Sequence, residues 1–144
     1  MHSNSSSGVR ARPGGLVGLT LFFVFGTLMS GLAAVALAAP GQWSERLWRL
    51  NPAALRSFEA LDGWAVPLML LVATACAAGA TGLWRGKRWG HRLAVALLSL
   101  NLVGDVANAL FRGDRRTLVG LPIGGAMLGY LLSRRIRDRF RAAG

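Results

Sequence analysis

The sequence predicts an all-α membrane protein with four transmembrane helices and short interfacial helices between spans 1 and 2. The chain has 144 residues, of which 53% are hydrophobic, although its net charge is +11. Its charged residues gather in short segments between long apolar runs. Each run approaches or exceeds the ~20 residues that an α-helix needs to cross a hydrocarbon layer about 30 Å thick. This arrangement favours a membrane protein over a basic soluble domain.

Four apolar runs are the predicted spans, at about 16–39, 63–84, 93–111 and 117–133. The first has 24 residues without Asp, Glu, Lys or Arg, and the second is also uncharged. Asp105 alone interrupts the third, and the fourth has 17 residues, the shortest length that spans a bilayer. We therefore expect residues 14–141 to form a single four-helix membrane domain. Residues 1–13 are expected to be a disordered cytoplasmic tail, because residues 1–9 are mostly polar and small and contain few apolar side chains that could pack.

The basic residues are distributed unequally over the two sides of such a membrane domain. The N-terminal tail, loop 84–92 and the C-terminus carry two, four and five of them, and the two segments on the opposite side, 40–62 and 112–116, carry three each. One side thus has eleven basic residues and the other has six. By the positive-inside rule, both termini are predicted to lie in the cytoplasm. Basic residues beside span ends also account for the net charge, so nucleic acid is not expected as a partner.

The first span also has features of a secretory signal. Arg10 and Arg12 precede it, and Ala36-Leu37-Ala38 resembles the small-residue pattern of a cleavage site, so cleavage, which would leave three spans, is the alternative. Its apolar run is longer than the core of about 7–15 residues typical of signal peptides. Four small residues also recur at four-residue intervals and suit close helix packing, namely Gly26, Ser30, Ala34 and Ala38. Retention is therefore expected.

The segment between the first two spans predicts two short amphipathic helices. Trp43, Leu47 and Leu50 fall at i, i+4 and i+7, on one helix face. Asn51 can cap a second helix that has Pro52 at its first position. We expect both helices to lie in the membrane interface, and a lid over a ligand site is the alternative.

Small residues are abundant in the spans. Three pairs have G-x-x-x-G spacing, which lets helix backbones approach closely in lipid: Gly14 with Gly18, Gly120 with Gly124, and Gly125 with Gly129. Packing within one chain is expected, and homodimerisation is the alternative.

The third span carries a polar face, the candidate intramembrane polar site. Asn101, Asp105 and Asn108 stand at i, i+4 and i+7 and share one side of the helix. An intramembrane carboxylate costs about 2.5–3.5 kcal/mol on insertion scales, so the face should turn toward other helices. We expect Asp105 to be protonated, hydrogen-bonded or paired with a cation, for which Arg112 is a candidate. Structural hydrogen bonding is the expected role, and ion or proton handling the alternative.

The C-terminal segment is strongly basic around two apolar residues. Ile136 and Phe140 are four apart on a helix and are expected to dip into the inner leaflet. The arginines around them are expected to contact anionic lipid phosphates; they are Arg134, Arg135, Arg137, Arg139 and Arg141. Docking of an acidic cytoplasmic partner fits the same charges.

Several chemistries lack the residues they require. Cys76 is the only cysteine, so we expect a small buried thiol and no intrachain disulfide or redox pair. His2 lies in the tail and His91 in the basic loop, which leaves no haem or zinc site to assemble. Val103-Gly104-Asp105 resembles a motif of intramembrane aspartyl proteases, but a second intramembrane Asp is missing. No catalytic, cofactor-binding or metal-binding residues are predicted, and an enzyme is not expected.

Four motifs stand out in the second half of the chain: G-L-W-R-G-K-R-W-G-H-R-L-A at 82–94, G-D-V-A-N-A-L at 104–110, G-L-P-I-G-G at 120–125 and L-L-S-R-R-I-R-D-R-F at 131–140. With these motifs, about residues 60–140 resemble small four-span bacterial integral membrane proteins of unassigned function. The resemblance implies a four-helix bundle in a bacterial inner membrane and supplies no catalytic residues.

The expected function is that of a non-enzymatic accessory or interaction component of that membrane. Its expected partners are anionic lipid headgroups on the cytoplasmic side and another membrane subunit or a second copy. The alternative is a small transporter or channel-like oligomer that uses the face formed by Asn101, Asp105 and Asn108.

Overall fold

The computed structural model describes residues 14–112 and 120–142, and in these ranges the chain is helical apart from short turns. The helices, in chain order, are α1 (Gly14–Ala38), α2 (Gln42–Leu50), α3 (Pro52–Glu59), a 3₁₀ turn η1 (Asp62–Trp64), α4 (Ala65–Trp84), α5 (Arg88–Arg112), α6 (Gly120–Leu132) and α7 (Arg134–Ala142). The all-α class is confirmed for these residues. The expected tail 1–13, most of the loop 112–116 and the first three residues of the fourth span lie outside them.

Two of the described helices are long and apolar enough to cross a membrane, namely Gly14–Ala38 and Asp62–Trp84, which joins η1 to α4. Only 17% of the first apolar window and 22% of the second is buried inside the chain, unlike the core helix of a soluble protein. Large apolar side chains such as Leu21, Phe25 and Leu28 of α1 are more than 60% exposed. An exposed apolar surface of this size is typical of a protein interface or of a surface that contacts a membrane.

The other two expected spans correspond to α5 and α6. Helix α5 begins at Arg88, five residues before the predicted start of the third span, and has 25 residues. The described part of α6 has 13 residues, so it is shorter than the predicted span 117–133. The structure thus shows two helices of spanning length and composition among the residues it describes, and the four-span arrangement remains a prediction.

Threonine hydroxyls in the two helices of spanning length are satisfied inside their own helix. The hydroxyl oxygens of Thr20 and Thr27 in α1 each donate a hydrogen bond of 2.9 Å to the carbonyl four residues earlier. Thr74 and Thr81 in α4 do the same at 2.8 Å. Because lipid offers no hydrogen-bond partner, this pattern lets a threonine lie in an apolar span at low cost.

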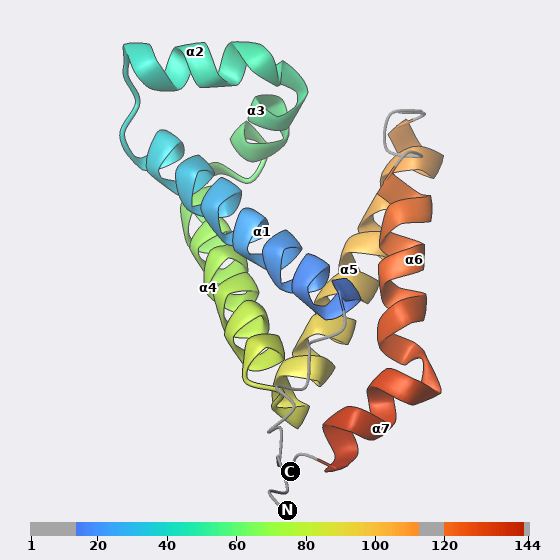
Figure 1. Cartoon of the computed structure of the whole chain (residues 1–144). Helices are drawn as coiled ribbons and strands as arrows, with labels where there is room; N and C mark the ends of the chain where they lie inside the picture. Colours follow the sequence, from blue (N-terminus) through green and yellow to red (C-terminus); the bar gives the residue numbers. More distant parts are fainter. Residues whose placement is uncertain (1–13, 113–119, 143–144) are drawn as a thin grey trace, which may run out of the picture.

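The helices form two pairs that diverge from the end of the molecule where α7 lies (Figure 1). Helices α1 and α4 make the most extensive contact, α5 packs against α4 and against α6, and α7 turns from the end of α6 toward the start of α5. The ridge that includes Gly26 and Ala34 is partly used in this packing, because Ala34 is buried and Gly26 lies against Cys76 of α4. At the opposite end, α2 and α3 cap the α1–α4 pair.

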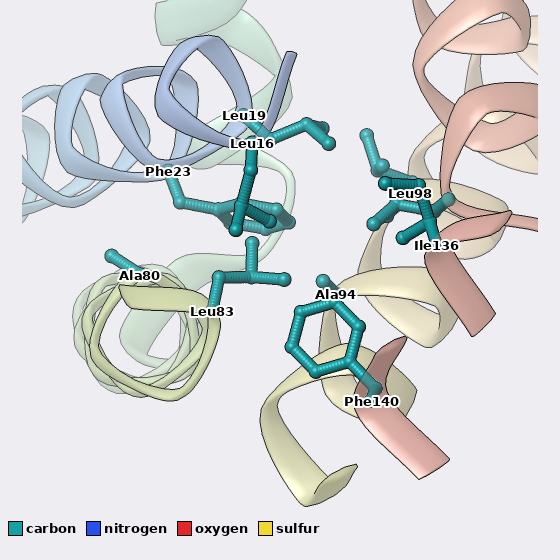
Figure 2. Close-up of a cluster of buried hydrophobic side chains, with 10 residues drawn as sticks. Leu16, Leu19, Phe23, Ala80, Leu83, Ala94, Leu98, Ile136 and Phe140 are labelled. Carbon is teal, nitrogen blue, oxygen red and sulfur yellow. The ribbon is translucent and has the colours of Figure 1, made fainter. Parts of the chain in front are cut away.

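The buried core is concentrated at the α7 end and draws on all five of the helices that meet there. Figure 2 shows Leu16 and Phe23 of α1, Leu83 of α4 and Ala94 of α5 converging with Phe140 of α7. Ile136 and Phe140 are only 2% and 3% exposed. The expectation that these two side chains dip into the inner leaflet is therefore wrong. They hold α7 against the bundle because the neighbouring helix ends offer a continuous apolar surface.

Helices α4 and α5 cross at a pair of glycines. A methyl group added to Gly82 would collide with the Gly90 backbone, and one added to Gly90 would collide with Gly82. The turn between the helices also needs a glycine, because Gly86 has a φ of +66°. The Gly86 amide donates to the Leu83 carbonyl and the Lys87 amide to the Gly82 carbonyl, the hydrogen bonds of a Schellman motif. The connection is thus shorter than the predicted loop 84–92.

The two short helices before α4 follow the prediction closely. The side chain of Asn51 accepts a hydrogen bond from the Ala54 amide, and Pro52 occupies the first turn of α3. Trp48 of α2 and Phe58 of α3 pack edge to face with ring centroids 5.7 Å apart. Trp43 and Leu50 are exposed, at 45% and 84%, so α2 presents an apolar edge away from the chain.

Candidate functional site

An open groove of about 420 Å³ lies between α1, α4 and α5. It adjoins the buried core, since Phe23 and Leu98 belong to both. Helix α1 also contributes Gly26 and Ser30, where small side chains leave room beside the helix. The groove exists because the α1–α4 pair and the α5–α6 pair are joined at the α7 end and diverge beyond it (Figure 1).

Two of the three predicted polar residues line this groove. Asn101 and Asp105 stand one turn apart on α5, and the Asn101 amide donates a 3.3 Å hydrogen bond to Oδ2 of Asp105. Asn101 is exposed and Asp105 is half-buried, so the pair faces the space between the helix pairs rather than a closed interior. Asn108 lies on the same helix, but its side chain, like that of Arg112, is outside the described residues.

The carboxylate of Asp105 lies against the described start of α6. A methyl group added to Gly120 would lie 3.3 Å from its Oδ2 atom, and one added to Gly124 would lie 3.5 Å from Leu102. This pair of glycines therefore faces α5 of the same chain, which confirms the expected packing within one chain at this position. Nothing lies within 4 Å of such a group at Gly14, Gly18, Gly125 or Gly129, so those two pairs are open in this structure.

The chemistry of the groove is that of an apolar slot with one polar wall. Phe22, Val72, Leu97 and Leu100 supply hydrophobic surface, whereas Asn101 and Asp105 supply an amide and a carboxyl group. At 3.3 Å the hydrogen bond between them is long for an N–H···O contact, and a carboxylate has up to four acceptor positions. The pair consequently has capacity for a further hydrogen-bond donor from an occupant of the groove.

Cys76 also lines the groove, from the α4 side. Its side chain is half-buried and packs against the buried core, so the expected burial of the thiol is confirmed only in part. The sulfur faces α1 at Gly26, because a methyl group added there would lie 3.3 Å from it. A single cysteine at this place gives a natural chemical probe of what fills the groove.

The second predicted set of residues lies on α7. Arg134, Arg135 and Arg137 are exposed, in agreement with side chains that can reach lipid phosphates. Arg139 and Arg141 belong to the same helix, but their side chains are outside the described residues. With Ile136 and Phe140 turned inward, α7 lies against the bundle and leaves these three arginines exposed.

His91 is the residue that the sequence interpretation missed. It lies in the first turns of α5, is only 9% exposed, and its Nε2 donates a 2.8 Å hydrogen bond to the Leu131 carbonyl near the end of α6. Its ring also packs against Phe140, with centroids 5.0 Å apart. The spacing of Gly90, Ala94 and Leu98, all on the buried face of α5, was the available signal, because His91 is adjacent to that face.

Comparison of the chain with protein-family models, curated proteins and solved structures found no match.

Proposed function

We propose that this chain is a non-enzymatic integral membrane protein, an accessory or interaction component of a bacterial inner membrane. In this proposal α1, α4, α5 and α6 are the four spans and both termini are cytoplasmic. The exposed apolar surfaces of α1 and α4 support membrane insertion, and the excess of basic residues at the α7 end supports the orientation.

The observation that carries the interaction role is the Asn101–Asp105 pair at the edge of the apolar groove. A carboxyl group at this depth in a membrane needs hydrogen-bond partners, and Asn101 provides one over 3.3 Å. A membrane-spanning helix of another subunit, or of a second copy, could place a polar group within hydrogen-bond distance of Asp105. The apolar side chains of the same helix would then fill the groove. Burial of this kind stabilises helix association in lipid through packing and interhelical hydrogen bonds.

Site-specific photo-cross-linking in native membranes tests this function. A photoreactive amino acid at Leu100, inside the groove, is expected to form a discrete protein adduct, because a partner helix occupies the groove. The same amino acid at Leu21 is the control, since Leu21 is 62% exposed and is not among the groove-lining residues.

The Asp105→Leu and Asp105→Asn variants sharpen the result. Leucine removes the hydrogen-bonding group and should abolish the Leu100 adduct, whereas asparagine keeps a polar group and should retain much of it. Equal adducts from Leu100 and Leu21, or an adduct that Asp105→Leu leaves unchanged, would contradict the proposed interaction.

A small transporter or channel-like oligomer that uses Asn101, Asp105 and Asn108 is the second candidate. The volume and openness of the groove favour it, because about 420 Å³ holds several water molecules, each of about 30 Å³ in the liquid. The mostly apolar walls favour the first candidate, because a hydrated ion needs polar groups along its path.

Labelling of Cys76 discriminates between the two candidates. A hydrated groove lets a charged, membrane-impermeant thiol reagent modify Cys76, whereas a groove filled by lipid or a partner helix admits only an apolar reagent. A Cys76→Ser variant with a new cysteine at Ala39 is the control, since Ala39 is exposed at the end of α1. Rapid modification of Cys76 by the charged reagent would overturn the first candidate.

The basic face of α7 is proposed to contact anionic headgroups on the cytoplasmic side. Arg134, Arg135 and Arg137 are exposed there, and each basic residue near an anionic surface contributes about 1 kcal/mol. This contact would hold the orientation of the bundle in the bilayer.

A further inference from the structure

A second pocket, of about 210 Å³, lies where the start of α5 meets α7. Three arginines line it, Arg88 and Arg92 from α5 and Arg137 from α7. The rings of His91 and Phe140 complete the lining. None of the five lining residues is acidic, and the nearest acidic residue along α7 is Asp138, which follows Arg137 and is exposed.

The positions of two lining residues are fixed by hydrogen bonds. The Nε of Arg88 donates a hydrogen bond of 3.2 Å to the Phe140 carbonyl, and this bond connects the first turn of α5 to α7. His91 is held by its bond to the Leu131 carbonyl and by contact with the Phe140 ring. The Leu131 carbonyl can only accept, so Nε2 of His91 carries the proton of that bond. The two rings of the pocket, His91 and Phe140, are thus part of the buried interior, whereas its three arginines are exposed side chains.

We propose that this pocket binds one phosphate-type oxyanion, with the headgroup of an anionic phospholipid as its source. Arg92 and Arg137 are exposed at the mouth of the pocket and come from different helices, so they can reach one phosphate from two sides. Guanidinium groups match phosphate oxygens with two parallel N–H···O bonds, and such charge-assisted bonds are about twice as strong as neutral ones.

The location favours a lipid source. The pocket lies at the α7 end of the bundle, where the charge distribution places the cytoplasmic surface of the proposed membrane domain. This inference rests on the proposed membrane placement. It adds one defined binding site to the general attraction between the exposed arginines of α7 and anionic headgroups. It also assigns a role to Arg92, which the sequence interpretation used only for topology.

The experiment titrates the full-length protein in neutral detergent with phosphatidylglycerol and counts bound lipids by native mass spectrometry. Phosphatidylcholine, titrated in the same way, measures binding to a zwitterionic headgroup. A parallel titration with inorganic phosphate measures binding of the oxyanion without acyl chains, which is independent of membrane insertion. We expect one phosphatidylglycerol to bind at least about tenfold more tightly than phosphatidylcholine.

A matched pair of double variants separates the pocket from the basic surface. R92Q/R137Q removes two charges from the pocket and should weaken phosphatidylglycerol binding at least about tenfold. R134Q/R135Q removes two charges from the same end of the molecule but outside the pocket, and should weaken it less than about twofold. Equal losses in the two variants, or equal binding of both lipids, would show diffuse attraction and overturn the proposal.

Two further readouts complete the test. Thermal unfolding without lipid shows whether R92Q/R137Q is folded; if it is not, R92K/R137K keeps the charges but loses the guanidinium forks, and should bind with intermediate affinity. If inorganic phosphate displaces phosphatidylglycerol, both bind at the same site, which supports the proposed oxyanion site. A soluble phosphate ester is then an alternative source of the bound phosphate group. Phosphatidylglycerol binding that resists inorganic phosphate supports the lipid as the source.

Discussion

Single residues at the α7 end decide how the helices of this chain meet. Gly82 and Gly90 let α4 and α5 cross with their backbones in contact, and Gly86 provides the left-handed turn between them. His91 then joins α5 to α6 through one hydrogen bond and contacts α7 through its ring. Gly82 and Gly90 are replaceable only at a cost because the facing backbone leaves no space, and Gly86 because its φ of +66° is strained for other residues.

Gly82→Ala tests the crossing of α4 and α5. The added methyl group meets the Gly90 backbone, which cannot rotate away, so the helices must separate. We expect a loss of about 1–3 kcal/mol, measured as the free energy of unfolding in detergent. Gly31→Ala is the control, because nothing lies within 4 Å of the new methyl group and alanine favours the helix. A Gly82→Ala variant as stable as Gly31→Ala would contradict the close crossing.

His91→Phe tests the bond between α5 and α6. Phenylalanine keeps an aromatic ring against Phe140 but cannot donate to the Leu131 carbonyl, which is then left without this partner near the end of α6. We expect unfolding in detergent to require about 1–3 kcal/mol less than in the unmodified protein, the cost of an unsatisfied buried polar group. Unchanged stability would mean that solvent or another donor satisfies this carbonyl.

At the scale of elements, local sequence signals account for the beginnings and ends of several helices. Asn51 caps α3, Pro52 fits its first turn, and the Gly86 turn ends α4. The same local signals do not reveal which side of an apolar helix is buried. Helix α1 shows this clearly, since Phe23 is 2% exposed and Phe25, two residues later, is 61% exposed.

Asn51→Ala tests the cap between α2 and α3. Loss of the side-chain oxygen leaves the Ala54 amide without its 3.2 Å hydrogen bond, which should cost the local helix about 1 kcal/mol. We expect faster backbone hydrogen exchange across Pro52–Glu59, with exchange in α4 unchanged. Asn51→Asp, which keeps an acceptor at the same place, should leave the exchange of α3 close to that of the unmodified protein.

In the molecule as a whole, the basic residues are unequally distributed between the two ends. The basic turn between α4 and α5 and the arginines of α7 lie at one end, and the small helices α2 and α3 lie at the other (Figure 1). The largest buried cluster lies at the basic end, and beyond it the helix pairs diverge and leave the groove between them. This asymmetry is the structural basis of the proposed orientation.

Reporter fusions test that orientation. A reporter after Gly144 should be in the cytoplasm, and one inserted between α2 and α3 should be on the outer side, because eleven of the 17 basic residues lie on the predicted cytoplasmic side. The mass of the membrane-purified chain is the accompanying control, since cleavage after Ala38 would remove the first span. An outer location of the C-terminus would contradict the orientation.

The sequence by itself determined the all-α class, the approximate limits of the apolar helices and the Asn51–Pro52 start of α3. These features depend on residue propensities, apolar run length and side chains within one turn of each other, all of which are local. Asn101 and Asp105 were correctly placed on one face for the same reason, since a spacing of four residues defines a helix face.

Only the tertiary structure decided which apolar faces are buried. Ile136 and Phe140 turn inward rather than toward lipid, His91 joins three helices, and Cys76 is half-buried in a groove. In a membrane protein the lipid-facing and protein-facing sides of a helix are both apolar, so hydrophobic periodicity cannot separate them. What separates them is the fit of one helix surface to another, and that fit depends on residues far apart in the chain, such as Gly90 against Gly82 and Phe140 against His91.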